Sequence, residues 1–208
     1  EHKAGEKCFV DYSGNGIPIV DTKTGEIRDC QLFVSALGAS SYIFAHASES
    51  QELSCWLDSH VKMYAFFGGV TALTVPDNLK SGVTKACRYD PEVNRSYHDL
   101  AEHYGTCVIP ARPYKARDKA KVETSVLVAQ RWIVAKLRKK TFYSIAEVNS
   151  AIAECLEQIN TKVMRHLGKS RKELFLSLDK PALKPLPTKA FELAIWKKAR
   201  LNIDYHIG

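Results

Sequence analysis

The sequence predicts a mixed α/β domain followed by a smaller helical extension. Several strand-like runs, rich in β-branched and aromatic residues, come before the first helical pattern, and strands then alternate with helices. The 208 residues are 45% hydrophobic and 25% charged, which is ordinary for a soluble fold. Apolar stretches all fall short of the roughly 20 residues that span a bilayer, so a membrane protein is excluded.

The first part of the chain is predicted to be mostly β-structure. Glycine-containing turns separate the runs, as in Gly14-Asn15-Gly16 and in the segment from Asp21 to Gly25. The predicted strands are residues 6–13, 17–20, 26–37, 40–47, 71–75 and 107–109.

Helices are predicted from apolar positions that recur at helical spacing. Ser48 or Ser50 is expected to cap the first helix and Ser144 a later one, while Ser170 with Glu173 forms a capping box. Gly68 and Gly105 are expected to end helices. The predicted helices run from residue 48 or 50 to 67, and over 92–104, 117–139, 144–160 and 170–176.

Three carboxylates lie in three kinds of local sequence that suit one shared task. Asp11 lies in the apolar run Phe9-Val10-Asp11-Tyr12, Asp77 follows the strand-like run that ends at Pro76, and Glu123 lies near the start of a helical pattern. A carboxylate in an apolar strand is costly unless a positive group compensates it. Three convergent carboxylates are what two divalent ions acting on phosphate require. Taken singly, each has a plainer interpretation: the aspartates cap turns or helices, and Glu123 pairs with Lys119 four residues earlier.

Three segments carry a resemblance to a known family. They are Val10-Asp11-Tyr12-Ser13-Gly14, Pro76 to Val83, and Lys119-Ala120-Lys121-Val122-Glu123 with Val128 to Ile133 after it. In this order the chain resembles the catalytic core of the DDE transposases and retroviral integrases. It is most similar to the IstA-type transposases of bacterial insertion sequences. The separations are 77 − 11 = 66 and 123 − 77 = 46 residues. The second is longer than in compact viral integrases, which predicts an extra loop or helix before Glu123.

The resemblance implies a ribonuclease-H-like, retroviral integrase-like mixed sheet flanked by helices. It also implies two Mg²⁺ ions, with Mn²⁺ as a substitute: Asp11 bridges both, and Asp77 and Glu123 each hold one. The implied reaction cleaves transposon ends and joins their 3′-hydroxyls to target DNA. A hydrolytic nuclease on the same fold, and a non-catalytic DNA-binding assembly module, remain open alternatives.

Charge is distributed unevenly along the chain. Residues 1–110 carry 9 Lys and Arg against 14 Asp and Glu, whereas residues 111–208 carry 21 against 9. We expect DNA contacts from a basic run, with a further lysine after Asp77; a solvated lysine-rich surface is the alternative. The expected DNA-binding residues are Lys80, Lys115, Arg117, Lys119 and Lys121.

The remaining expectations concern partners and domain limits. The six scattered cysteines predict reduced thiols, and no phosphate-loop motif occurs, so ATP use would come from a partner. The resemblance implies double-stranded DNA, a homo-multimer and an AAA+ helper ATPase as partners, in a cytoplasmic bacterial setting. We read the chain as a fragment of a longer protein. The expected parts are a catalytic core at 1–140, a helical extension at 141–179, a proline-containing linker at 180–195 and the start of a truncated β-domain at 196–208.

Overall fold

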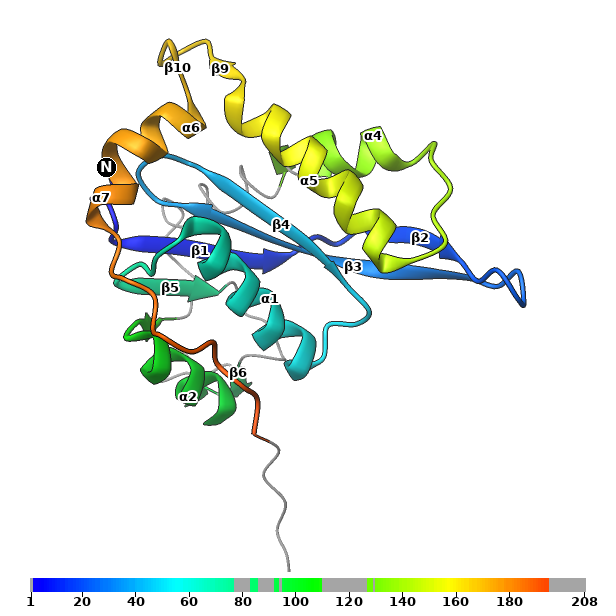
Figure 1. Cartoon of the computed structure of the whole chain (residues 1–208), viewed down its shortest axis with the longest axis horizontal. Helices are drawn as coiled ribbons and strands as arrows, with labels where there is room; N and C mark the ends of the chain where they lie inside the picture. Colours follow the sequence, from blue (N-terminus) through cyan, green and yellow to red (C-terminus); the bar gives the residue numbers. More distant parts are fainter. Residues whose placement is uncertain are drawn as a thin grey trace, which may run out of the picture.

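The computed structural model describes residues 2–76, 83–85, 92–93, 95–109, 127–128 and 130–194. A six-stranded mixed sheet forms the centre, and α1 and α5 lie in front of it in Figure 1. The strands are β1 (Lys7–Tyr12), β2 (Ile17–Val20), β3 (Ile27–Leu37), β4 (Ile43–Ser48), β5 (Leu73–Pro76), β6 (Val83–Lys85), β7 (Glu92–Val93), β8 (Cys107–Val108), β9 (Val163–Met164) and β10 (Lys169–Ser170). The helices are α1 (Leu53–Phe67), α2 (Arg95–Tyr104), the π-helix η1 (Gln130–Val134), α4 (Ala135–Leu137), α5 (Ile145–Thr161), α6 (Arg171–Leu174), the π-helix η2 (Phe175–Asp179) and α7 (Lys180–Ala182).

The sheet combines antiparallel and parallel pairing, as the order of predicted elements indicated. Its strand order is β2-β3-β1-β5-β8, and β4 also pairs with β3. The strand β1 runs antiparallel to β3 and parallel to β5, which in turn runs parallel to β8. The predicted strands at 6–13, 17–20 and 26–37 are confirmed, and β4 begins three residues later than the run at 40–47 suggested.

Successive side chains of β1 point to opposite faces of the sheet. Cys8, Val10 and Tyr12 are buried on the face that α1 covers, where Cys8 Sγ lies 3.6 Å from Met63 Sδ. The Tyr12 ring packs 5.5 Å from that of Trp56, centroid to centroid. Phe9 points to the opposite face, in a small cluster with the β5 residue Val75. The large core therefore lies on the α1 side, and Asp11 shares its face with Phe9.

Helix α1 starts later than predicted and has a different cap. Neither expected serine caps it: the helix follows Glu52, which makes no side-chain cap bond. Ser50 Oγ instead accepts the Glu52 N–H within the preceding turn, and Ser48 Oγ donates to the Ser50 carbonyl. Both hydroxyls are thus used by the turn, and the serines lie two and four residues before the N-cap position Glu52. The predicted end is confirmed, because Gly68 adopts φ 61°.

The later helices agree better with the sequence. Ser144 caps α5 by accepting the Glu147 N–H, and Ser170 with Glu173 forms the predicted capping box. Helix α2 begins at Arg95 rather than at 92, because Glu92–Val93 pairs with β6. The run that begins in α6 continues through η2 and α7 to Ala182, so the proline segment starts as helix.

Helix α5 covers the free edge of β4 through two asparagines. Asn160 accepts from the Ile43 N–H at 3.0 Å and donates to the Ile43 carbonyl at 2.8 Å. Asn149 makes the same pair of bonds with Ala47, at 2.8 Å and 3.0 Å. The two residues are three helical turns apart and therefore face the strand together. Each side-chain amide takes the place of a neighbouring strand's peptide group, so the β4 edge is satisfied by a helix.

A buried aspartate joins the helical extension to the sheet. Asp179 is 1% exposed, and its two carboxylate oxygens accept the backbone N–H groups of Gly5 and Ser40 at 2.8 Å and 2.9 Å. The next residue, Lys180, donates to the Phe67 carbonyl at the end of α1. These contacts place the end of η2 against the start of β1 and the β3–β4 turn.

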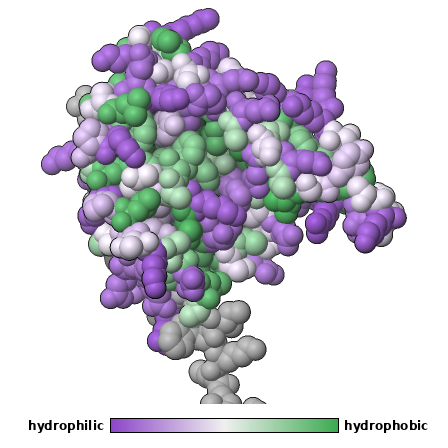
Figure 2. All heavy atoms as spheres, viewed as in Figure 1, coloured by the Kyte–Doolittle hydropathy of each residue, from purple (hydrophilic) through white to green (hydrophobic). Residues whose placement is uncertain are grey.

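The outer surface is mixed in character. Figure 2 shows polar side chains around smaller apolar patches on the face that carries α1 and α5. Exposed hydrophobic residues of the described part of the chain include Phe66, at 40% exposure, and Leu176, at 57%. Among the described helices, none combines the length and the apolar character that crossing a bilayer requires.

Replacing Asn160 with alanine is expected to lower the free energy of unfolding by about 2–4 kcal/mol. The change leaves the N–H and C=O of Ile43 without partners in a buried site. Urea denaturation measures the effect. Ser150→Ala, on the exposed face of the same helix, is the matched control and should change stability by less than about 0.5 kcal/mol. Equal stability of the two variants would show that β4 does not depend on this amide.

His60 should make stability depend on pH. It is fully buried, its Nδ1 lies 2.8 Å from the Trp56 carbonyl and its Nε2 lies 2.9 Å from the Tyr97 hydroxyl. Burial lowers the pKa of His60 from 6.5 to about 4. The unfolded chain therefore binds the extra proton first, and stability decreases as pH falls from about 6.5 towards 4.

Between about pH 7 and pH 5, His60 should account for a loss of about 2 kcal/mol. Urea midpoints measured across this range test the expectation. His60→Gln should have a lower stability at neutral pH and a shallower dependence of stability on pH. Some dependence should remain, because burial and Lys62 also lower the pKa of His46 to about 4. A His60→Gln slope as steep as that of the parent would contradict the assignment.

Candidate active site

Asp11 is the one sequence-predicted site residue within the described ranges. It lies on β1, half-buried, between the fully buried Val10 and Tyr12. The carboxylate oxygen Oδ1 accepts the Tyr12 N–H at 2.8 Å. Its partner across the antiparallel pair is Val34, which is 1% exposed. The carboxylate thus emerges from an apolar part of the sheet and is only half-buried.

The strand ends around Asp11 meet at one edge. The strands β1, β5 and β8 run in the same direction, so their carboxyl ends point the same way. In the β1–β5 pair, Lys7 is opposite Leu73 and Val10 is opposite Pro76. Open α/β sheets bind ligands beyond the carboxyl ends of their parallel strands. This edge is therefore where a site would form.

The other predicted site residues lie outside the described residues. They are Asp77, Lys80, Lys115, Arg117, Lys119, Lys121 and Glu123. Of the described residues, no three His, Cys, Asp or Glu side chains gather in a way that would hold a metal ion. Asp11 itself supplies the hard oxygen donor that Mg²⁺ prefers, so the residue present fits such an ion.

The helix predicted at 117–139 is described only from residue 127 onwards. Ile133 and Leu137, the later members of its predicted apolar stripe, are 0% and 1% exposed, as expected. Gln130–Val134 forms a π-turn, which the sequence pattern did not indicate. A π-turn inserts one residue and rotates the following side chains, so positions before and after it no longer follow one α-helical stripe.

A cavity that the sequence analysis missed lies between η1, the end of α5 and the β9–β10 hairpin. It is lined by Trp132, by the cations Lys162, Arg165 and Arg171, and by His166, with no carboxylate among its lining residues. The lysine and arginines of the lining do not suit a divalent metal. The sequence does contain a dense run of basic residues between 162 and 172, which is the feature that points to this cavity. DNA contacts were expected instead from the basic run at 112–121.

The curated relatives of the chain are transposases. It is 52% identical over 207 residues to the predicted transposase y4uI of Sinorhizobium fredii, covering 99% of this chain and 40% of that protein. It is 42% identical over 207 residues to the predicted transposase of insertion sequence IS408 from Burkholderia multivorans, covering 100% and 40%. The transposase of the element IS21 from Pseudomonas aeruginosa is 26% identical over 204 residues, at 98% and 47% coverage. The chain spans about two fifths of the length of the first of these relatives. No protein-family model matches it.

Solved structures agree on the fold. The catalytic core domain of BIV integrase superposes with a TM-score of 0.60 at 12% identity, covering 84% of this chain and 95% of that one. The HTLV-2 integrase catalytic core in complex with magnesium superposes with a TM-score of 0.58 at 11% identity, covering 83% of this chain and 97% of that one. A chain of the simian T-cell lymphotropic virus intasome superposes with a TM-score of 0.63 at 16% identity, covering 94% of this chain and 61% of that one.

Sheet topology and structural likeness together show a ribonuclease-H-like fold, similar to that of retroviral integrase catalytic cores, as the resemblance implied. By sequence, the homologues of this chain are the transposases of insertion sequences, IS21 among them.

Proposed function

We propose that this chain is the catalytic core of a DNA transposase. It would cleave the ends of an insertion sequence and join their 3′-hydroxyls to target DNA, with Asp11, Asp77 and Glu123 as the catalytic carboxylates. The observation that carries the proposal is the parallel pairing of β1 with β5. In that pairing each β1 residue is opposite the β5 residue 66 positions later, as in Lys7 with Leu73 and Val10 with Pro76.

The same offset separates Asp11 from Asp77, since 77 − 11 = 66. Asp77 is joined to Pro76, and adjacent Cα atoms are about 3.8 Å apart. One further step of the register would make the two aspartates partners on one face of the sheet. Two carboxylates on facing positions of adjacent strands repel each other unless a cation lies between them. The pairing therefore supports a shared metal site at this edge.

The third carboxylate and the basic run would complete the site from the chain that follows β8. Residues 107–109 leave the sheet at the edge where β1 and β5 also end, and the basic run follows directly. We propose that Glu123 approaches the two aspartates from the helix that ends in the buried stripe of Ile133 and Leu137. Lys115, Arg117, Lys119 and Lys121, with Lys80, would contact DNA phosphates.

Carboxylate ligands suit Mg²⁺, with Mn²⁺ as a substitute. Two bound ions would activate the attacking hydroxyl and stabilise the leaving oxygen. The magnesium complex of the HTLV-2 integrase core supports this choice. In the protein itself, the Tyr12 N–H would hold the Asp11 carboxylate in place, and the buried Val34 would limit rotation of the Asp11 side chain. The lysines and arginines would orient the phosphodiester for in-line attack.

We further propose that the whole protein acts as a homo-multimer on double-stranded DNA, with an AAA+ helper ATPase. The intasome assembly of a structural neighbour supports the multimer. The helper ATPase follows from the resemblance to the IstA-type transposases and from the lack of a phosphate-loop motif in this sequence.

Asp11→Asn, Asp77→Asn and Glu123→Gln should each reduce Mg²⁺-dependent cleavage and joining of DNA by at least about 100-fold. Each change keeps the shape of the side chain and removes the charge that holds a metal. Gel assays of strand cleavage and strand joining measure the loss. Calorimetric titration with Mg²⁺ provides a second readout, in which the variants should bind the ion more weakly than the parent.

Asp58→Asn is the matched control for these variants. Asp58 is an exposed α1 carboxylate, paired with Lys62 at 2.6 Å, so the same chemical change there should leave activity and metal binding unchanged. Near-normal activity in any of the three variants would remove that residue from the site. Cutting without joining would identify a nuclease, and DNA binding without metal-dependent chemistry would identify an assembly module.

Changing Lys119 and Lys121 to alanine should weaken binding to unrelated DNA sequences about equally. Each lost phosphate contact should lower the slope of log affinity against log salt concentration by about 0.9. Fluorescence anisotropy over a salt series measures both quantities. Lys23→Ala removes the same charge from an exposed turn and should leave the slope unchanged. If the double variant has the slope of this control, the basic run is a solvated surface.

A further inference from the structure

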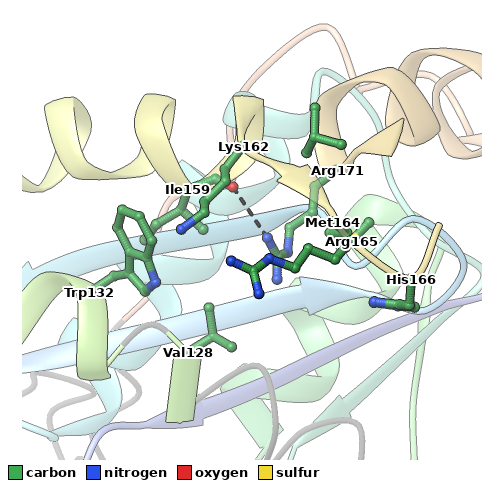
Figure 3. A pocket seen from close by; sticks show the side chains of 9 residues that line it. Val128, Trp132, Ile159, Lys162, Met164, Arg165, His166 and Arg171 are labelled. Carbon is green, nitrogen blue, oxygen red and sulfur yellow. Dashed lines mark hydrogen bonds between the residues drawn. The ribbon is translucent and has the colours of Figure 1, made fainter. Parts of the chain in front are cut away.

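The cavity beside Trp132 is built from three separate segments of the chain. Figure 3 shows Trp132 and Val128 on one side, Ile159 and Lys162 from the end of α5 above, and Arg165 and His166 from the β9–β10 turn on the other side. Its volume is about 380 Å³. That is the lower range of small-molecule sites, enough for one nucleotide but not for a folded segment.

Positive charge is concentrated in this cavity. Lys162, Arg165 and Arg171 line it with His166, and its lining includes no aspartate or glutamate. The ion pairs found among the described residues use other cations, such as Lys172 with Glu157 and Lys62 with Asp58. Cations held this close together repel each other, so the site as a whole favours an anion.

Arg171 shows the clearest need for a ligand. Its Nη1 donates to the Ile159 carbonyl at 3.2 Å, while its buried Nε has no hydrogen-bond partner among the described residues. Burial lowers the pKa of Arg171, although the guanidinium stays charged. A buried cationic donor without an acceptor is unfavourable, and a phosphate oxygen is an acceptor that matches the guanidinium fork.

Trp132 adds a flat apolar wall to the cationic site. Lys162 Nζ lies 4.4 Å from the centroid of its ring, so the lysine is held over the indole face. Val128 and Ile159 extend the apolar surface. A free inorganic anion would make no use of this wall. An aromatic face beside phosphate-binding cations is the arrangement by which proteins hold nucleotides whose bases are unpaired.

We propose that this cavity binds one nucleotide of a DNA strand, its phosphate between Lys162, Arg165 and Arg171 and its unpaired base against Trp132, with the Lys162 ammonium turning from the indole face to the phosphate. The site would hold a flanking or frayed end of the DNA. That the polymer is DNA rests on the proposed function; the site itself does not depend on the carboxylates or on metal.

Binding of two labelled DNAs in EDTA tests the proposal. One is a blunt duplex and the other is the same duplex with a short single-stranded end, and fluorescence anisotropy is measured over a salt series. Lys162→Ala and Arg165→Ala should weaken binding of the DNA with the single-stranded end about tenfold and lower its salt slope by about 0.7 each. Trp132→Leu should weaken binding of this DNA by about 5- to 150-fold and that of the blunt duplex less than about twofold.

Lys169→Ala is the matched control, because Lys169 is exposed on the same hairpin but does not line the cavity. Lys162 and Arg165 are also exposed, so their variants should fold normally; a thermal unfolding scan checks this for Trp132→Leu. Pocket variants that bind like Lys169→Ala would overturn the proposal, and so would a Trp132→Leu loss that is equal for both DNAs. Because EDTA removes the metal, failed cleavage chemistry with intact pocket binding would contradict the proposed function alone.

Discussion

The structure depends on the position of β1 between an antiparallel and a parallel neighbour. Its hydrogen bonds to β3 fix which of its residues face α1, and its pairing with β5 fixes the register of the two parallel strands up to Val10 and Pro76. Parallel pairing requires a long crossover, which here includes α1 and buries Trp56, His60 and Tyr64 against the sheet. The same pairing therefore organises both the main core and the edge where the carboxylates are proposed to meet.

Most of the strands could be predicted from the sequence because they are rich in β-branched and aromatic residues and are separated by glycine turns. Helix α5 and the α6 capping box were predictable for a similar reason: Ser144, Ser170 and Glu173 act on residues three positions away. The start of α1 was not predictable. Two serines were candidates for the cap, and local hydrogen bonds within the preceding turn use both of them.

The carboxylate site and the cavity beside Trp132 differ in how well they can be predicted from the sequence. Asp11 is conspicuous because a charge within an apolar strand is rare and needs a reason. Trp132, Lys162 and Arg171 lie in three elements, and each alone resembles an ordinary surface or core residue. Their proximity arises from the packing of η1 against the end of α5 and from the turn of the hairpin. Such a cluster becomes visible only in three dimensions.

The asparagine contacts of α5 have a consequence for how copies of this domain can associate. A free strand edge is the usual place where one chain adds to the sheet of another, by swapping or by aggregation. The Ile43 and Ala47 peptide groups of β4 are already bonded to Asn160 and Asn149. Sheet extension across this edge would require α5 to detach and both amides to lose their partners. Any association of two copies on this flank would therefore use side-chain surfaces and not strand addition.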